Sequence, residues 1–200
     1  FFDLALQGAL PNLRCLAPTC REEYLAMLDW AIDQDSRPMV IRVPGNGVVS
    51  NPDFALDPKA PADFTLPRYD VVHEGSDVAI LALGSFFSLG ESLCDALSAP
   101  ADGGPALDAT LVNPRFATEL DEATLDDLAR SHRVIVTLED GVLEGGWGEK
   151  VARYLGPTSV RVLCYGVRKG FPDRFDADEL LAENGMTLEA ITADIRVALS

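Results

Sequence analysis

A glycine-rich run after an apolar segment is the part of the sequence best suited to binding an anion. GVLEGGWG at Gly141–Gly148 follows an apolar stretch and opens a predicted helix. A strand, a glycine-rich turn and a helix N-terminus can together cradle a phosphate. The spacing is neither GxGxxG nor a P-loop, so the glycines could equally permit a tight turn and close packing of helix on sheet. The first reading predicts an independent anion-binding module, and the second a structural turn.

Two carboxylates, Glu139 and Asp140, stand at the end of the preceding strand, where α/β sheets place their ligands. They could act as acid and base or bind a metal. Neighbouring strand residues point to opposite faces, which favours a structural role in which one of them caps the next turn or helix. Ser85 also ends an apolar strand, but GSFFSLG is not the GxSxG nucleophile motif.

Arg42 is the candidate residue for contact with a substrate. It lies in an apolar strand beside a Pro-Gly turn. Its guanidinium could hold a phosphate or carboxylate through two parallel hydrogen bonds. It could equally pair with an acid of this chain such as Asp33 or Asp35. The residues alone leave both alternatives open.

No set of residues stands out as catalytic, cofactor-binding or metal-ligating. The four cysteines form no CxxC pair, and both histidines are far from them in the sequence. His132 ends a polar helix and is predicted to lie at the surface. The acidic pairs Glu22-Glu23 and Asp126-Asp127 are predicted to be solvated helix faces.

Composition narrows the possible partners and compartment. The 200 residues carry 16 Lys and Arg against 32 Asp and Glu, a net charge of −16. So acidic a chain without a basic patch argues against nucleic acid and anionic membranes as partners. No apolar run reaches the roughly 18 residues of a membrane helix. Four cysteines in a chain of this size do not suggest a disulfide framework, which predicts a cytoplasmic protein.

Apolar strands alternate with amphipathic helices along the chain, which predicts an α/β fold with a mainly parallel sheet. Thr19 and Glu22 have the spacing of a capping box at the start of the first predicted helix. The proline-rich stretch 51–68 predicts a linker and a domain boundary. The predicted strands are 13–16, 39–43, 78–83, 107–112, 134–138 and 160–164, and the predicted helices are 89–97, 122–130, 148–155, 179–183 and 188–199 with one more near 22–32.

Several segments in order resemble the C-terminal part of the 1-deoxy-D-xylulose-5-phosphate synthases. The resemblance runs almost end to end and extends more distantly to transketolase. The segments that carry it are FDLAL (Phe2–Leu6), LPNLRCLAP (Leu10–Pro18), VIRVPGNG (Val40–Gly47), DVAILALGS (Asp77–Ser85), NPRFATELD (Asn113–Asp121), VTLEDGVLEGGWG (Val136–Gly148) and GFPDRF (Gly170–Phe175).

This resemblance implies a fold and a domain division. Residues 1–50 would be the tail of a pyrimidine-binding α/β domain, and 51–68 a linker. Residues 69–200 would be a transketolase C-terminal domain, a mainly parallel sheet with one antiparallel edge strand and helices on both faces.

The resemblance also implies a function for the parent protein, a transferase that depends on thiamine diphosphate and Mg²⁺. It would decarboxylate pyruvate and join the product to an aldehyde, as a homodimer. The family's cofactor-binding and catalytic groups precede the segment that begins here at Phe1, so this chain is expected to bind no cofactor and to be inactive alone. The start at Phe1, without a methionine, suggests an interior cut.

The alternative is a split or degenerate transketolase-like subunit with a role in assembly, its amino-terminal cofactor-binding domain on a separate chain. The family carries arginines where this sequence has Gly8 and Gly45. These departures suggest an acceptor other than glyceraldehyde 3-phosphate.

Overall fold

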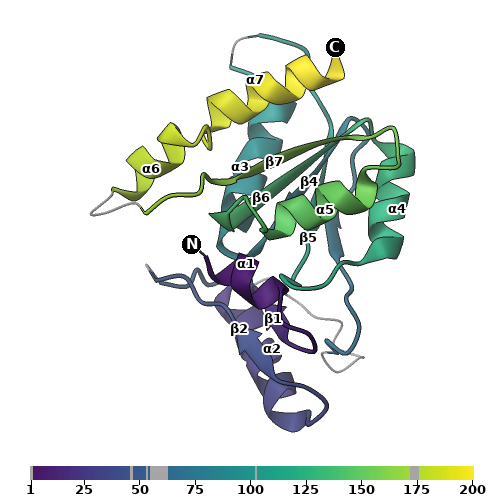
Figure 1. Cartoon of the computed structure of the whole chain (residues 1–200). Helices are drawn as coiled ribbons and strands as arrows, with labels where there is room; N and C mark the ends of the chain where they lie inside the picture. The colour runs from purple at the N-terminus through teal and green to yellow at the C-terminus, as the bar shows by residue number, and fades with distance from the viewer. Residues whose placement is uncertain (1, 46, 53, 55–62, 102, 172–175) are drawn as a thin grey trace.

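The computed structural model describes residues 2–45, 47–52, 54, 63–101, 103–171 and 176–200. Within them the strands form two sheets, one of two strands and one of five. Figure 1 shows α1, β1, α2 and β2 below the larger sheet and its helices. The elements in chain order are α1 (Asp3–Gly8), β1 (Arg14–Leu16), α2 (Arg21–Asp33), β2 (Met39–Ile41), β3 (Asp70–His73), β4 (Val78–Ala82), η1 (Gly84–Phe86), α3 (Phe87–Ser98), β5 (Ala109–Asn113), α4 (Glu122–Ser131), β6 (Val134–Val142), α5 (Trp147–Leu155), β7 (Arg161–Val167), α6 (Ala177–Glu183) and α7 (Leu188–Leu199).

The larger sheet has the order β3-β5-β4-β6-β7. Its strands are parallel except β3, which pairs antiparallel with β5 at one edge. The predicted fold class, with a single antiparallel edge strand, is therefore confirmed. β4 lies at the centre, and all five of its residues are buried, as expected for a strand covered on both faces.

Helices cover both faces of this sheet. On one face, Leu81 and Ile135 pack with Leu125 of α4 and Val151 of α5. On the other, side chains of the same strands pack with α3 and α7. The alternation of side chains along each strand divides the core into these two layers.

The smaller sheet pairs β1 with β2 in parallel, with Cys15 opposite Val40. β1 also lies against the segment after β5. Leu16 forms an antiparallel bridge to Phe116. The amide of Ala17 donates to the carbonyl of Arg115 at 2.8 Å, and that of Ala117 to the carbonyl of Cys15 at 2.8 Å. The NPRF segment therefore joins the two sheets.

Glu23 links the part of the molecule that contains the smaller sheet to the part that contains the larger sheet. Its position shows that two predictions from the sequence were wrong. It is fully buried and Glu22 is half-buried, whereas both carboxylates were expected to be solvated. α2 begins after Cys20, and Glu23 rather than Glu22 accepts the amide and hydroxyl hydrogen bonds of Thr19, at 2.7 and 2.9 Å. The predicted capping box was wrong by one residue.

The Glu23 carboxylate also accepts hydrogen bonds from residues that follow the larger sheet's strand β5. Asn113 Nδ2 donates at 3.0 Å and Arg115 Nε at 2.6 Å. Arg115 adopts φ of 61°, a left-handed conformation that costs a non-glycine residue about 1 kcal/mol. Its Nη2 also reaches Asp70 of β3 at 2.7 Å. These bonds fix the segment that bridges to β1.

His132 is a further correction. It was expected at the surface, but it is 8% exposed, and its Nε2 lies 2.9 Å from Thr110 Oγ1 and 3.2 Å from the carbonyl of Gly75. It fills the corner between the end of α4 and β5. Asp126 and Asp127 are exposed, as predicted.

We predict that Glu23→Ala lowers the free energy of unfolding by about 3 kcal/mol, because it leaves buried polar partners without an acceptor. Urea unfolding followed by circular dichroism measures the change. Glu22→Ala, one residue earlier and only half-buried, is the matched control and should cause a much smaller loss. Equal losses in the two variants would show that Glu23 does not link the two parts.

Candidate functional site

The glycine-rich turn and Glu139 form one unit at the start of α5. The Glu139 side chain is fully buried and turns back toward the helix. Its Oε2 accepts the amide of Trp147 at 2.7 Å, and its Oε1 the amide of Gly148 at 3.0 Å. The predicted capping role of one of the two carboxylates is confirmed, and the capping residue is Glu139.

This carboxylate explains two of the glycines. A Cβ on Gly146 would lie 2.6 Å from Glu139 Oε1 and 2.5 Å from the carbonyl of Val142. A Cβ on Gly148 would lie 2.6 Å from Thr137 Oγ1. The space in which a phosphate would sit is therefore filled by Glu139, and the turn serves close packing rather than an external anion.

Burial of Glu139 disfavours the charged form of its carboxyl group. Desolvation raises the pKa of this carboxyl to about 7, although the two amide hydrogen bonds and the nearby Lys150 and Arg42 favour the charged form. Lys150 lies in the first turn of α5, and its ammonium pKa is lowered by burial. The Lys150 Nζ atom is buried and has no hydrogen-bond partner among the described residues.

Arg42 follows β2 and fastens α1 to the larger sheet. Its Nε donates to Asp3 Oδ2 at 2.6 Å and its Nη2 to Asp3 Oδ1 at 3.2 Å. The same Nη2 donates to the carbonyl of Asp140 at 2.9 Å. The guanidinium therefore holds a carboxylate of this chain in the bidentate geometry that the sequence suggested, but the acid is Asp3, and the candidate partners Asp33 and Asp35 were wrong.

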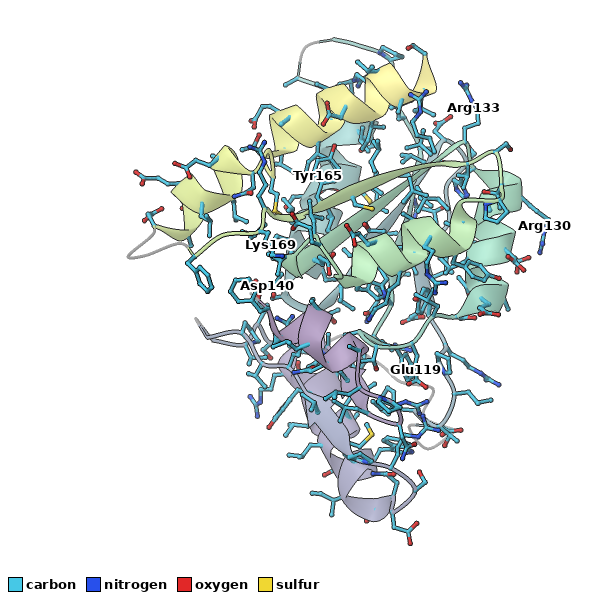
Figure 2. All side chains as sticks on the ribbon, viewed as in Figure 1. Glu119, Arg130, Arg133, Asp140, Tyr165 and Lys169 are labelled. Carbon is cyan, nitrogen blue, oxygen red and sulfur yellow. The ribbon has the colours of Figure 1, made fainter. Side chains whose placement is uncertain are left out.

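Strand ends from both sheets meet beside Arg42. A cavity of about 60 Å³ lies between Arg42, Pro44, Ser85 and Asp140. It adjoins a groove of about 350 Å³ that shares Pro18, Val43, Pro44 and Ser85 with it and extends to α3. Ser85 itself is exposed on η1. Figure 2 places Asp140 and Glu119 where the two parts of the molecule meet.

Glu119 marks the other end of this boundary. It accepts from Arg14 Nη2 at 2.8 Å and from Arg37 Nη1 at 3.1 Å. Sequence reasoning missed Arg14, Glu119 and Asp3, because their partners are 39 to 105 residues away along the chain. An isolated arginine in an apolar segment was the available signal, and it was read only for Arg42.

The other candidate residues from the sequence analysis do not come together into a site among the described residues. All four cysteines are free. Among the described residues, no group of three or more histidine, cysteine and acidic side chains is placed to hold a metal ion. None of the described helices has the length and apolar character needed to cross a membrane.

We predict that stability gained from Glu139 depends on pH. The pKa of its carboxyl in the folded chain, about 7, lies above the ordinary 4.5. Its contribution is therefore fully present below pH 4.5 and is lost as the pH rises through 7, by about 3 kcal/mol in all. Urea unfolding of the wild type and of Glu139→Gln between pH 4.5 and 8 measures this difference.

The wild type should gain stability relative to Glu139→Gln as the pH falls across that range. Asp140→Asn removes the neighbouring, more exposed carboxyl and is the matched control. A gap between wild type and Glu139→Gln that stays constant with pH would mean that Glu139 titrates alike in the folded and unfolded chain.

Comparison with known proteins supports the resemblance seen in the sequence. Residues 68–191 match the family "Transketolase, C-terminal domain". The 1-deoxy-D-xylulose-5-phosphate synthase of Thioalkalivibrio sulfidiphilus (strain HL-EbGR7) is 36% identical, with 100% of this chain and 29% of the relative aligned. That of Dechloromonas aromatica (strain RCB) is 33% identical over 98% of this chain and 29% of the relative. The chain thus spans about three tenths of the length of these relatives.

A solved structure described as "Split gene transketolase, inactive beta4 tetramer" superposes with a TM-score of 0.78. It is 28% identical, and the match covers 99% of this chain and 61% of that one. The sequence, fold and solved relative agree: the chain belongs to the transketolase family and carries the C-terminal domain of that family over residues 68–191.

Proposed function

We propose that this chain supplies the C-terminal part of a thiamine-diphosphate-dependent transferase of the 1-deoxy-D-xylulose-5-phosphate synthase type. The observation that carries the proposal is the alignment of the whole chain with synthases more than three times as long. The reaction of the whole enzyme would be decarboxylation of pyruvate followed by carboligation to an aldehyde. Cytoplasmic location and a homodimeric parent are part of the same proposal.

We propose the domain division given by the sequence for this chain. Residues 1–50 would end a pyrimidine-binding domain, 51–68 would be a linker, and 69–200 would be the C-terminal domain. The matched family model begins at residue 68, close to the proposed start of the last domain. Residues 55–62 of the linker lie outside the described residues.

The residues of this chain do not fit the diphosphate of the cofactor at the one motif that suggested it. The amides of Trp147 and Gly148 are occupied by Glu139, and a diphosphate there would meet a buried carboxyl instead of free donors. Thiamine diphosphate and Mg²⁺ would belong to an amino-terminal domain, on the same or a separate chain.

Arg42 stays our candidate on the substrate side, as a positioning residue. Its hold on Asp3 and on the carbonyl of Asp140 fixes α1 and the end of β6 around the small cavity. At Gly8, an added Cβ would lie 1.8 Å from Lys150 Nζ. A cation therefore stands beside α1, supplied by α5. At Gly45 no atom lies within 4 Å of an added Cβ.

A second candidate function is assembly alone, in which the chain is a subunit that binds a separate amino-terminal chain. The similarity to a protein described as a split gene transketolase favours it. The two functions differ in whether the assembled complex turns over pyruvate.

We predict that the 200-residue chain alone consumes no pyruvate when thiamine diphosphate, Mg²⁺ and an aldehyde are supplied. Co-expression with the portion of the Thioalkalivibrio relative outside the aligned span should give a complex that does. The assay is release of CO₂ from pyruvate. Turnover by the isolated chain would contradict the proposal, and a stable complex without turnover would support assembly alone.

We further predict that Arg42→Ala in that complex lowers kcat/KM for the aldehyde at least tenfold, mainly through KM, because α1 and the end of β6 lose their common tie. Arg42→Lys should recover part of the loss, since a single ammonium cannot reproduce the bidentate pair. Steady-state kinetics at several aldehyde concentrations tests this. A lower melting temperature with unchanged KM would assign Arg42 to stability only.

A further inference from the structure

The cavity and the groove beside Arg42 together have the size of a small-molecule site. Their volumes are about 60 and 350 Å³, and Pro44 and Ser85 line both. Sites for small molecules in proteins commonly have volumes of roughly 300–1,000 Å³. The charges of the lining side chains therefore limit which substrates this chain can help to bind.

Arg42 is the only cationic side chain among the described residues that line the cavity or the groove. Its charge is balanced within the chain, because Nε and Nη2 donate to the Asp3 carboxylate at 2.6 and 3.2 Å. Nη2 also lies 3.8 Å from Asp140 Oδ2. An arginine whose Nε and Nη2 already hold a carboxylate has no such pair of donors left for a phosphate. Only Nη1 has no hydrogen-bond partner among the described residues.

Carboxylates outnumber cations among the described lining residues. Asp140 lines the cavity, and its side chain is 40% exposed. Glu91 of α3 lines the groove and is exposed. A phosphate group carries a charge of roughly −1.5 to −2 at neutral pH, so these carboxylates repel it. The lining therefore disfavours a phosphorylated substrate.

The other cations at the boundary do not reverse this balance. Arg14 and Arg37 both pair with Glu119, and Arg115 pairs with two carboxylates of its own. The Nζ atom of Lys150 is buried inside the chain. None of these four basic side chains lines the cavity or the groove. A phosphate in either space would find no unpaired guanidinium or ammonium from this boundary.

Uncharged hydroxyl groups are what the lining offers a ligand instead. Ser85 of η1 lines both spaces, and Tyr24 and Ser88 line the groove. Their side-chain hydroxyls form no hydrogen bond with a described residue. Each hydroxyl can both donate to and accept from a hydroxyl of a substrate. The lining therefore favours an uncharged, hydroxylated ligand.

We propose that the aldehyde accepted at this site is an uncharged hydroxyaldehyde rather than a phosphorylated one. This inference rests on the proposed function, which makes the boundary beside Arg42 part of the acceptor site. The sequence suggested an acceptor other than glyceraldehyde 3-phosphate, and the lining supplies its charge class. Arg42 Nη1 and the Ser85 hydroxyl donate to oxygens of the aldehyde, and Asp140 repels a phosphate.

Kinetics with two aldehydes that differ only in the phosphate group test the proposal. The complex with the non-aligned portion of the Thioalkalivibrio relative, obtained by co-expression, is given pyruvate and either D-glyceraldehyde or D-glyceraldehyde 3-phosphate. The value of kcat/KM should be at least tenfold higher for D-glyceraldehyde. An equal or higher value for the phosphorylated aldehyde would overturn the proposal and leave the proposed enzyme function standing.

Gly45 offers a way to change this preference. It lines the cavity, no atom lies within 4 Å of an added Cβ, and its backbone is not left-handed. Gly45→Arg adds an unpaired cation and should raise kcat/KM for D-glyceraldehyde 3-phosphate at least tenfold. Gly45→Met adds a long side chain without charge, is the matched control and should give no such rise. Equal effects of the two variants would overturn the proposal.

A binding measurement decides the matter if the complex does not turn over pyruvate. Glycerol 3-phosphate is titrated to millimolar concentration into the 200-residue chain, and the NMR shifts of the Gly45 and Ser85 amides are followed. The wild type should show no saturating shift, whereas the Gly45→Arg chain should show one at Ser85. Saturation in the wild type would overturn the proposal independently of the enzyme function.

Discussion

The buried carboxylate of Glu23 is the interaction on which the joining of the two sheets depends. It lies in the first turn of α2 and receives hydrogen bonds from Thr19, Asn113 and Arg115. A buried acceptor with this many donors tolerates little displacement, because each lost bond leaves a polar group unpaired. The hydrogen bonds of Glu23 hold α2 at a fixed distance from the end of β5. They also keep Arg115 in its left-handed conformation. The bridge from Leu16 to Phe116 follows from that geometry.

The same constraint determines which part of the small sheet is left open. Once the segment after β5 lies along one edge of β1, β2 must take the other, and further growth of the sheet is possible only beyond β2. The arginines of the boundary then have assigned partners within the chain: Arg14 with Glu119, Arg42 with Asp3, and Arg115 with Glu23. An acidic protein with half as many basic as acidic residues thus uses four of its cations at this boundary, because Arg37 also pairs with Glu119.

What the sequence could predict depended on the range of the interactions. The alternation of apolar strands and helices is local, so β4, α5 and most other elements were predicted within a few residues. β3 and α1 were missed, because β3 is short and exposed at an edge and α1 is a six-residue helix held by Arg42. The partners of Glu23, His132 and Arg42 are distant in the sequence, and no periodicity encodes them. The cap by Glu139 was predictable because its partners are eight and nine residues away.

The Glu139 unit shows why a glycine-rich turn after a strand does not by itself indicate a phosphate site. The requirement for glycine at 146 and 148 is the same whether the turn surrounds a ligand or a side chain. A buried carboxyl provides the negative charge that the N-terminus of α5 attracts, and burial in turn raises its pKa. The turn therefore needs no ligand to be complete.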